Sequence, residues 1–191
     1  MIHLETCKDR KNRAQIKKLY LEAFPAEERM PFFLFHLKKK GQADLSGVYE
    51  KGKLAGMVYC VRHKNMVFIF YLAVEKSLRG RGYGSRILEK LKEKYRDCSL
   101  VLNMEEVDPS YENYEQRKKR KDFYRKNGFR ESGFKIREYG VIYEFMYYGQ
   151  NTTVREYQEL LRNYFGKFLY GLYRKNSAVV KQEKEDVRRE H

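Results

Sequence analysis

The sequence predicts an α/β (α+β-like) fold: a mixed, mostly antiparallel twisted sheet flanked by helices. Residues 67–74 are apolar on both faces, as in a strand that is covered on both sides. This strand runs into a glycine-rich loop, a helix and another strand, which together make a βαβ unit with a right-handed crossover. Strand pairs joined by tight turns surround the unit. We therefore expect one domain over residues 1–148, followed by an amphipathic helix and a charged tail over 149–191.

The segments before the central strand alternate between helical and strand patterns. Residues 2–6 are expected to form a short edge strand. A helix begins near Asp9, since apolar residues then recur three and four positions apart until Pro25. A second short helix is expected from Pro31 to Lys40. A hairpin with its turn at residues 50–53 follows.

The segments after the glycine-rich loop complete the domain. Apolar residues over 87–95 mark a helix, and residues 99–104 read as a short strand. A strongly basic helix is expected over 111–127. Residues 129–148 then form two strands that turn near residues 138–140.

A separable helix is expected over residues 152–173. Thr153 and Glu156 fit a capping box at its start. Gly166 and Gly171 each weaken the helix by roughly 1 kcal/mol relative to alanine. Its apolar stripe comprises Tyr157, Leu160, Leu161, Tyr164, Phe165, Phe168, Leu169, Leu172 and Tyr173. We expect this stripe to pack against the domain or against a second copy in a homodimer, and the tail over 181–191 to fray.

Composition excludes several classes of protein. The chain has 191 residues, of which 42% are hydrophobic, so a sizeable core rather than a disordered chain is expected. Lysine and arginine total 41 against 26 acidic residues, which gives a net charge of +15. Such a charge favours an anionic partner: a phosphate-bearing cofactor, a nucleic acid or a membrane surface.

The cysteines, histidines and apolar runs point to a cytoplasmic protein without a metal. Cys7, Cys60 and Cys98 are odd in number and far apart, which argues against disulfides and zinc. The histidines form no cluster with ligand spacing. The chain start becomes charged before any apolar region, and the longest apolar run, Met66–Val74, is too short to cross a membrane. We expect no membrane partner.

The glycine-rich loop over residues 79–85 is the most informative stretch. Its alternating glycines let the backbone approach a ligand, and the following helix start offers unpaired N–H groups, so the loop suits a diphosphate. A nucleotide triphosphatase loop would need Gly-Lys-Ser/Thr, but Gly84 is followed by Ser85-Arg86. A dinucleotide fingerprint would need glycine instead of Ser85. Glu105 lies where the ribose-binding acidic residue of such a fingerprint would be. The second βαβ half of a dinucleotide-binding fold does not follow, however, which argues against this class.

Two motifs together resemble the GNAT superfamily of acyl-CoA N-acyltransferases. Arg79, Gly82 and Gly84 match its Arg/Gln-x-x-Gly-x-Gly/Ala pattern between strand and helix. Residues 123–129 resemble its second signature, Phe-Tyr-x-x-x-Gly-Phe at a helix end. The resemblance implies a GNAT-like sheet over residues 1–148 and an acetyltransferase that uses acetyl-CoA.

The resemblance also implies roles for particular residues. Amides from Arg79 to Ser85 would hold the coenzyme A diphosphate, and a backbone N–H near Val74, on a bulged strand that splays from its neighbour, would bind the thioester oxygen. Tyr124 would be the general acid that protonates the departing thiolate. The expected cofactor-binding residues are Leu72, Ala73, Val74, Arg79, Gly80, Arg81, Gly82, Tyr83, Gly84, Ser85 and Asn103.

The general base is left open by the sequence. Family members that acetylate histones carry a glutamate early in the central strand, where this chain has Val67-Phe68-Ile69. Glu105 and Glu106 at the end of the next strand are candidates, as is the pair Glu27–Glu28. Deprotonation through ordered water needs none of them.

The predicted function is therefore direct transfer of an acetyl group from acetyl-CoA to an amine, in a ternary complex. The acceptor can be a small metabolite, a peptide N-terminus or a protein lysine, and the motifs do not separate acetyl from longer acyl donors. The alternatives are a basic nucleic-acid-binding protein without catalysis and a GNAT-like fold that binds coenzyme A without turnover. The basic run Arg117–Lys121 is expected to be a solvated helix face rather than a nucleic-acid site.

Overall fold

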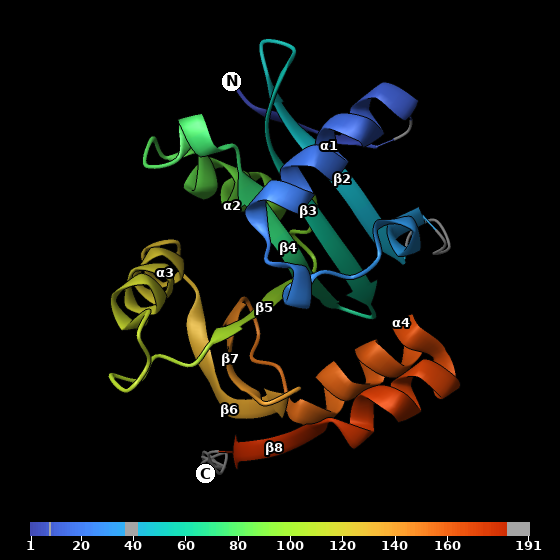
Figure 1. Ribbon diagram of the computed structural model, residues 1–191, viewed down its shortest axis with the longest axis vertical. Helices are drawn as coiled ribbons and strands as arrows, with labels where there is room; N and C mark the ends of the chain where they lie inside the picture. Colours follow the sequence, from blue (N-terminus) through green and yellow to red (C-terminus); the bar gives the residue numbers. More distant parts are fainter. Residues whose placement is uncertain (8, 37–41, 183–191) are drawn as a thin grey trace, which may run out of the picture. The chain divides into compact units, whose positions relative to one another are not determined.

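A computed structural model describes residues 1–7, 9–36 and 42–182 of the chain (Figure 1). The chain divides into two compact units, Met1–Leu102 and Asn103–His191. Strand β5 (Ser99–Glu105) runs from the first unit into the second. The domain boundary after residue 148 stays a prediction, and the charged tail from residue 183 onward lies outside the described residues.

The first unit is built on a mixed sheet whose last two strands belong to the predicted βαβ unit. In spatial order its strands are β1 (His3–Thr6), β2 (Ala43–Glu50), β3 (Lys53–His63), β4 (Met66–Val74) and β5. Neighbours among β1 to β4 are antiparallel, and β4 and β5 are parallel. The predicted edge strand, hairpin, central strand and crossover are thus confirmed.

Two-residue turns set the register of the hairpins. Lys51 and Gly52, between β2 and β3, both have positive φ angles, 50° and 74°. Two consecutive residues of this kind form the type I′ turn, whose twist matches that of paired strands. Lys64, in the turn between β3 and β4, has a φ of 52°. The hairpins therefore place β4 beside β3.

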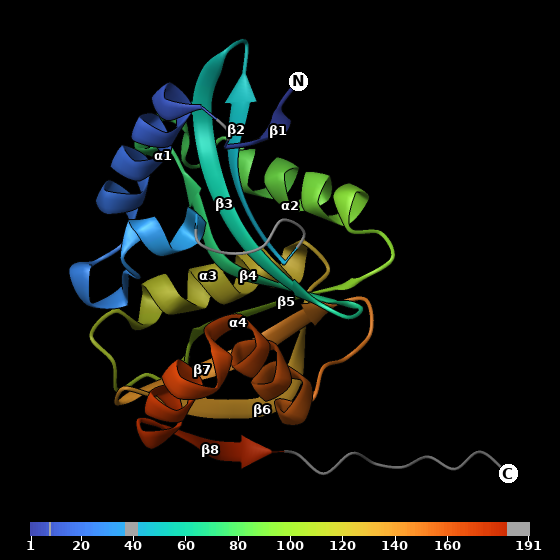
Figure 2. The ribbon, with the colours of Figure 1, turned by 90° about the vertical axis from the view of Figure 1, so that its right-hand side faces the viewer.

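Helices α1 (Arg10–Ala23) and α2 (Tyr83–Lys94) cover opposite faces of this sheet (Figure 2). The Asp9 carboxylate accepts the Asn12 N–H at 2.8 Å and so caps the start of α1. Each helix buries an apolar stripe on the strands: Ile16, Leu19, Tyr20, Ile87, Leu88 and Leu91. Burial of such side chains stabilises the fold by about 1.5–3 kcal/mol each.

The short helix expected from Pro31 to Lys40 is a 3₁₀ helix in its described part, η2 (Phe32–His36), and residues 37–40 lie outside that part. A one-turn 3₁₀ helix, η1 (Ala26–Glu28), precedes it. Phe35 explains the tight geometry, because its buried ring packs 4.3 Å from the ring of Tyr59 on β3. Because a single buried aromatic residue anchors this segment, a longer helix with an amphipathic face is not needed.

The second unit consists of strands and helices that follow β5. They are α3 (Tyr114–Lys126), β6 (Arg130–Glu138), β7 (Val141–Tyr148), α4 (Val154–Lys175) and β8 (Ser177–Gln182). Strand β6 pairs antiparallel with both β7 and β8. The turn predicted near residue 139 is confirmed, with φ angles of 49° at Tyr139 and 88° at Gly140.

Strand β8 was not predicted, and the expectation that the chain frays from Lys181 is wrong for its first two residues. Lys181 and Gln182 are paired with Lys135 and Phe134 of β6. The segment shows no alternation of buried and exposed positions, since both Val179 and Val180 are exposed. Pairing along a strand edge, rather than an apolar pattern, forms this strand.

Helix α4 starts as predicted but is broken at Gly166. The capping box of Thr153 and Glu156 is present. Gly166 has φ 77° and ψ 166°, which no residue inside a helix adopts, so two helical arms meet there (Figure 1). The first arm buries its stripe as far as Tyr164, whereas Phe168 in the second arm is 79% exposed. The expected continuous helix is therefore wrong, because Gly166 occupies a conformation that side chains resist.

A buried carboxylate ties both arms of α4 to β6. The Glu138 carboxylate accepts the hydroxyl of Tyr157, in the first arm, at 3.0 Å and that of Tyr173, in the second, at 2.5 Å. Burial raises the pKa of Glu138, against the opposing effect of these two hydrogen bonds. The two tyrosines fix the bend between the arms.

The break in α4 gives a prediction with opposite signs for two glycines. Gly166→Ala should lower the free energy of unfolding by about 1–3 kcal/mol, because alanine is strained at this backbone geometry. Gly171→Ala should raise it by about 0.5–1 kcal/mol, since Gly171 is helical and an added methyl group meets nothing within 4 Å. Urea unfolding followed by circular dichroism measures both. A stabilising Gly166→Ala would show that the chain does not bend there.

Candidate functional site

Strand β4 separates from β5 before it reaches its end. The parallel pairing runs from Met66 to Phe68, which lies opposite Val101, and no further pair is present in the described structure. Against β3, the register skips Phe70, so β4 carries a bulge between Ile69 and Tyr71. A bulge bends a strand and redirects its backbone groups. The bulged strand that the GNAT resemblance implied is thus present.

The last residues of β4 turn backbone groups away from β3. Glu75 donates its N–H to the Ala55 carbonyl at 2.9 Å, so this pair is hydrogen-bonded across the strands. Because such pairs alternate in an antiparallel ladder, Val74 and Leu72 direct their N–H and C=O groups to the other side, toward which β5 pairs. Ala73, between them, directs its backbone toward β3.

The turn after β4 is braced by its own side chains. The Glu75 carboxylate accepts the Ser77 N–H at 2.7 Å and its hydroxyl at 2.9 Å, and these bonds lower the pKa of Glu75. Together they form the one-turn helix η3 (Lys76–Leu78). Arg79 Nε then donates to the Val74 carbonyl at 3.1 Å, so this predicted cofactor residue ties the loop to the end of β4.

The glycine-rich loop leaves a row of amides without partners. Gly80 and Gly82 have φ angles of 74° and 76°, and a Cβ added at either would meet nothing within 4 Å. The first amide of α2 with an acceptor is that of Arg86, which donates to the Gly82 carbonyl at 3.1 Å. Within the described ranges, no acceptor pairs with the N–H groups from Gly80 to Ser85, Gly84 included. Such donors at a helix start attract an anion.

Glu50, at the end of β2, holds the start of α2 in place. Its carboxylate accepts the Tyr83 hydroxyl, and Arg86 Nη2 donates to it at 2.7 Å. These bonds lower the pKa of Glu50 to about 2, with the Tyr83 hydroxyl as the largest cause. The Tyr83 hydroxyl is therefore engaged, and only its amide is available to the predicted cofactor site, while Arg81 is exposed. Nothing in the sequence around Glu50 indicates this role, since its partners lie far along the chain.

Tyr124, in the second unit, lies among aromatic rings near the end of α3. Its ring centroid is 5.1 Å from that of Phe123 and 5.8 Å from that of Phe129. Gly128, with φ 79°, ends the helix and lets Phe129 turn into the core. Burial raises the pKa of Tyr124. No hydrogen bond to its hydroxyl is present in the described part of the chain.

The acidic candidates for the general base are engaged by cations. Glu105 pairs with Arg117 and Arg120, each at 3.0 Å. Glu106 pairs with Lys135 at 2.7 Å. Both candidate carboxylates are therefore shared with cations of the second unit, and their role as the base stays a prediction. Asn103 is half-buried on β5.

The pair Glu27–Glu28 lies in η1. Glu28 contributes its backbone carbonyl, which accepts the Tyr71 hydroxyl at 2.8 Å. The side chain of Glu27 is outside what the structure describes. No metal centre is indicated either: the described residues contain no group of three or more potential metal ligands.

The basic run on α3 differs from the solvated face that was expected. Arg117 is only 7% exposed, and besides Glu105 it binds the Glu106 carbonyl at 2.9 Å. Lys121 pairs with Glu144 at 2.5 Å. Part of the run is thus internal to the unit, because neighbouring strands supply acidic partners that the local sequence does not show.

Comparison with known proteins finds one family model that matches the central part of the chain. Residues 43–131 match the family model of the acetyltransferase (GNAT) domain. That part of the chain therefore resembles a GNAT acetyltransferase domain. This matched stretch contains β4, the glycine-rich loop, β5 and α3, and therefore both predicted motifs. No curated protein matches the sequence.

Solved structures share the GNAT fold at low identity. A GNAT-family protein from Bacteroides thetaiotaomicron is 21% identical with a TM-score of 0.65, covering 90% of this chain and 98% of its own. An aminoglycoside 6'-N-acetyltransferase complexed with coenzyme A is 16% identical (TM-score 0.63; 78% and 96% covered). A spermidine N-acetyltransferase from Vibrio cholerae, in complex with coenzyme A and spermine, is 14% identical (TM-score 0.61; 77% and 94% covered).

None of the described helices is both long enough and apolar enough to cross a membrane. Assignment to the cytoplasm stays a prediction.

The open loop predicts a specific loss of coenzyme A binding. Gly82→Ala should weaken binding about tenfold or more, because the strained residue disturbs the amide row and its methyl group enters the open side of the loop. Gly52→Ala is the matched control, since Gly52 has a φ of 74° and equally open surroundings but lies in the β2–β3 turn. Calorimetric titration with coenzyme A compares the two. Equal losses of coenzyme A affinity in the two variants would show that the loop does not form the binding site.

Proposed function

We propose that this protein is an acetyl-CoA-dependent N-acetyltransferase that transfers the acetyl group directly to an amine in a ternary complex. The observation that carries the proposal is the row of unpartnered amides from Gly80 to Ser85, open to solvent at the start of α2. Unpaired N–H donors with positive φ glycines among them form a concave anion site. A diphosphate is the anion that the GNAT domain implies.

The main chain does most of the binding in this proposal. The amides from Gly80 to Ser85 hold the diphosphate, and Arg79 and Arg81 add positive charge. Acetyl-CoA supplies an acetyl group that is activated as a thioester. The N–H groups of Leu72 and Val74, directed away from β3, are the donors for the thioester carbonyl and the amides of the pantetheine arm. A fixed donor at such an oxygen lowers the barrier by about 3 kcal/mol.

Tyr124 is the proposed general acid. Burial disfavours the phenolate, so the raised pKa keeps the hydroxyl protonated at neutral pH. A phenol of this kind can donate its proton to a departing thiolate. The absence of a hydrogen-bond partner for it among the described residues leaves that proton uncommitted.

Removal of the amine proton is proposed to occur through water. Glu105 and Glu106 are engaged by Arg117, Arg120 and Lys135, so an unshared carboxylate is not provided by either. The amine must lose its proton before it attacks, and bulk water at neutral pH accepts it when the amine has been desolvated. Ion pairing of Arg117 also removes it from the surface that a nucleic-acid-binding function would need.

Removal of one hydroxyl tests the general acid. Tyr124→Phe should lower kcat by about 10²- to 10⁴-fold, while acetyl-CoA still stabilises the protein by about 2.7 kcal/mol at 100 times its Kd. Tyr114→Phe, on the same helix, is the control and should leave kcat unchanged. Thiol release with a panel of amines gives the rate, and a thermal-shift titration gives the stabilisation. An unaltered rate in Tyr124→Phe excludes the acid role, and no stabilisation by acetyl-CoA excludes the enzyme.

The pH profile provides an independent check. The folded pKa of Tyr124 lies above its ordinary value of 10, so its acid form persists at least to pH 10. Ionisation of Tyr124 should therefore cause no decline of the rate at saturating substrate below pH 10. Any decline seen below pH 10 should persist in Tyr124→Phe. A decline centred near pH 8 that disappears in this variant would contradict the pKa that its surroundings impose.

A further inference from the structure

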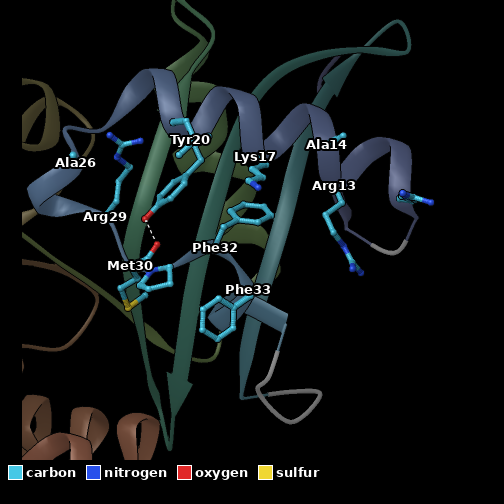
Figure 3. A pocket seen from close by; sticks show the side chains of 12 residues that line it. Arg13, Ala14, Lys17, Tyr20, Ala26, Arg29, Met30, Phe32 and Phe33 are labelled. Carbon is cyan, nitrogen blue, oxygen red and sulfur yellow. Dashed lines mark hydrogen bonds between the residues drawn. The ribbon is translucent and has the colours of Figure 1, made fainter.

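A hollow of about 800 Å³ lies on the first unit between α1 and the 3₁₀ segments that follow it (Figure 3). Its volume is that of a site for a small organic molecule. Every lining residue comes from residues 10–33, so the hollow is distinct from the glycine-rich loop. Neither predicted motif contains any of these residues.

The floor of the hollow is apolar and held in place by hydrogen bonds. The Tyr20 hydroxyl donates to the Met30 carbonyl at 3.0 Å, and the Met30 N–H donates to the Tyr71 hydroxyl at 3.1 Å. The Tyr20 ring lies 5.8 Å from that of Phe32, and Phe33 beside it is 63% exposed. A fixed aromatic surface that remains accessible favours binding of an apolar group.

The rim of the hollow carries four cationic side chains. Arg10, Arg13 and Lys17 recur three and four positions apart on α1. Arg29 comes from the segment after η1 and lies toward the other end of the hollow from Arg13 (Figure 3). Among the described residues, none of them forms an ion pair with a carboxylate. The Nε of Arg29 is buried and has no hydrogen-bond acceptor. By contrast, Lys18, which does not line the hollow, pairs with Glu22.

A buried guanidinium N–H without an acceptor is costly, and a ligand anion that accepts from it would relieve that cost. Positive charges on several sides of a hollow also raise the local concentration of anions and repel polycations. The spermidine and aminoglycoside acetyltransferases of similar fold are named for polycationic molecules. The lining of this hollow selects for the opposite charge.

The hollow is joined to the strand that we propose binds the thioester. Tyr71 on β4 donates to the Glu28 carbonyl at 2.8 Å besides accepting from Met30, so the wall of the hollow is fixed to β4. The next residue in β4 is Leu72, whose N–H is among the proposed donors. The strand that carries the proposed donors thus also holds the wall of the hollow in place.

We propose that this hollow binds the acetyl acceptor, and that the acceptor is an amine with an apolar body and an anionic group, carboxylate or phosphate. That the ligand is an amine rests on the proposed function. That it has an apolar body and an anionic group rests on the lining of the hollow. Arg29 and Lys17 bind the anion, and the rings of Tyr20, Phe32 and Phe33 contact the apolar body.

The test uses three probes that share a ring and an amine: benzylamine, 4-(aminomethyl)benzoate and 4-(aminomethyl)benzylphosphonate. Calorimetric titrations of the full chain are run with and without coenzyme A. We expect at least one anionic probe to bind about tenfold or more tightly than benzylamine, and spermidine not to compete. The stronger of the two anionic probes distinguishes a carboxylate from a phosphate ligand.

Two charge reversals on adjacent residues control for long-range electrostatics. Lys17→Glu should abolish the preference for the anionic probes, whereas Lys18→Glu, which changes the net charge equally, should retain it. Arg29→Met should also reduce it. Equal affinity for all three probes, no binding of either anion, or equal effects of Lys17→Glu and Lys18→Glu would overturn the inference. Acetyl-CoA stabilisation, measured separately on each variant, reports failure of the proposed function independently.

Discussion

The separation of β4 from β5 is the constraint on which the candidate site depends. Once pairing stops at Phe68, the backbone groups of Leu72 and Val74 that point away from β3 have no strand to bind. Backbone donors rarely stay unsatisfied in a folded protein, so a segment of this kind is stable only where water or a ligand reaches it. The amides from Gly80 to Ser85 continue the same row of donors around the turn. Three side-chain ties keep that row open, from Glu75 to Ser77, from Arg79 to Val74 and from Glu50 to Tyr83.

Charge is distributed differently in the two units. In the second, Glu105, Glu106 and Glu144 neutralise cations of α3 and β6. Burial alone would lower the pKa of Lys135, but its two carboxylate partners raise it instead. In the first unit, the cations around the hollow have no such partners among the described residues. These cations of the first unit thus differ from those of the second, whose charge is neutralised internally.

Local patterns predicted most of the fold and the glycine-rich loop. Turn residues such as Lys51-Gly52 and Tyr139-Gly140, and the capping box at Thr153, act within a few residues, so the sequence displays them directly. The brace by Glu50, the ion pairs of Glu105 and the strand β8 all depend on partners far along the chain. Sequence spacing carries no signal for such partners. Gly166 was recognised as a weak point of a helix, but its left-handed φ follows from the packing of both arms on Glu138.

In the proposed function, the main chain of β4 binds the acetyl donor, whereas its Tyr71 side chain supports the hollow for the acceptor. This difference has an evolutionary consequence. Backbone amides persist whatever side chain a mutation brings, so the donor-facing edge of β4 tolerates extensive sequence change. The hollow beside Tyr71 is made of side chains from α1 and the loop after it, each of which a single mutation can replace. Under the proposed function, a lineage built in this way can acquire new acceptors while it retains its donor. A solved structure only 14% identical to this chain still shares its fold.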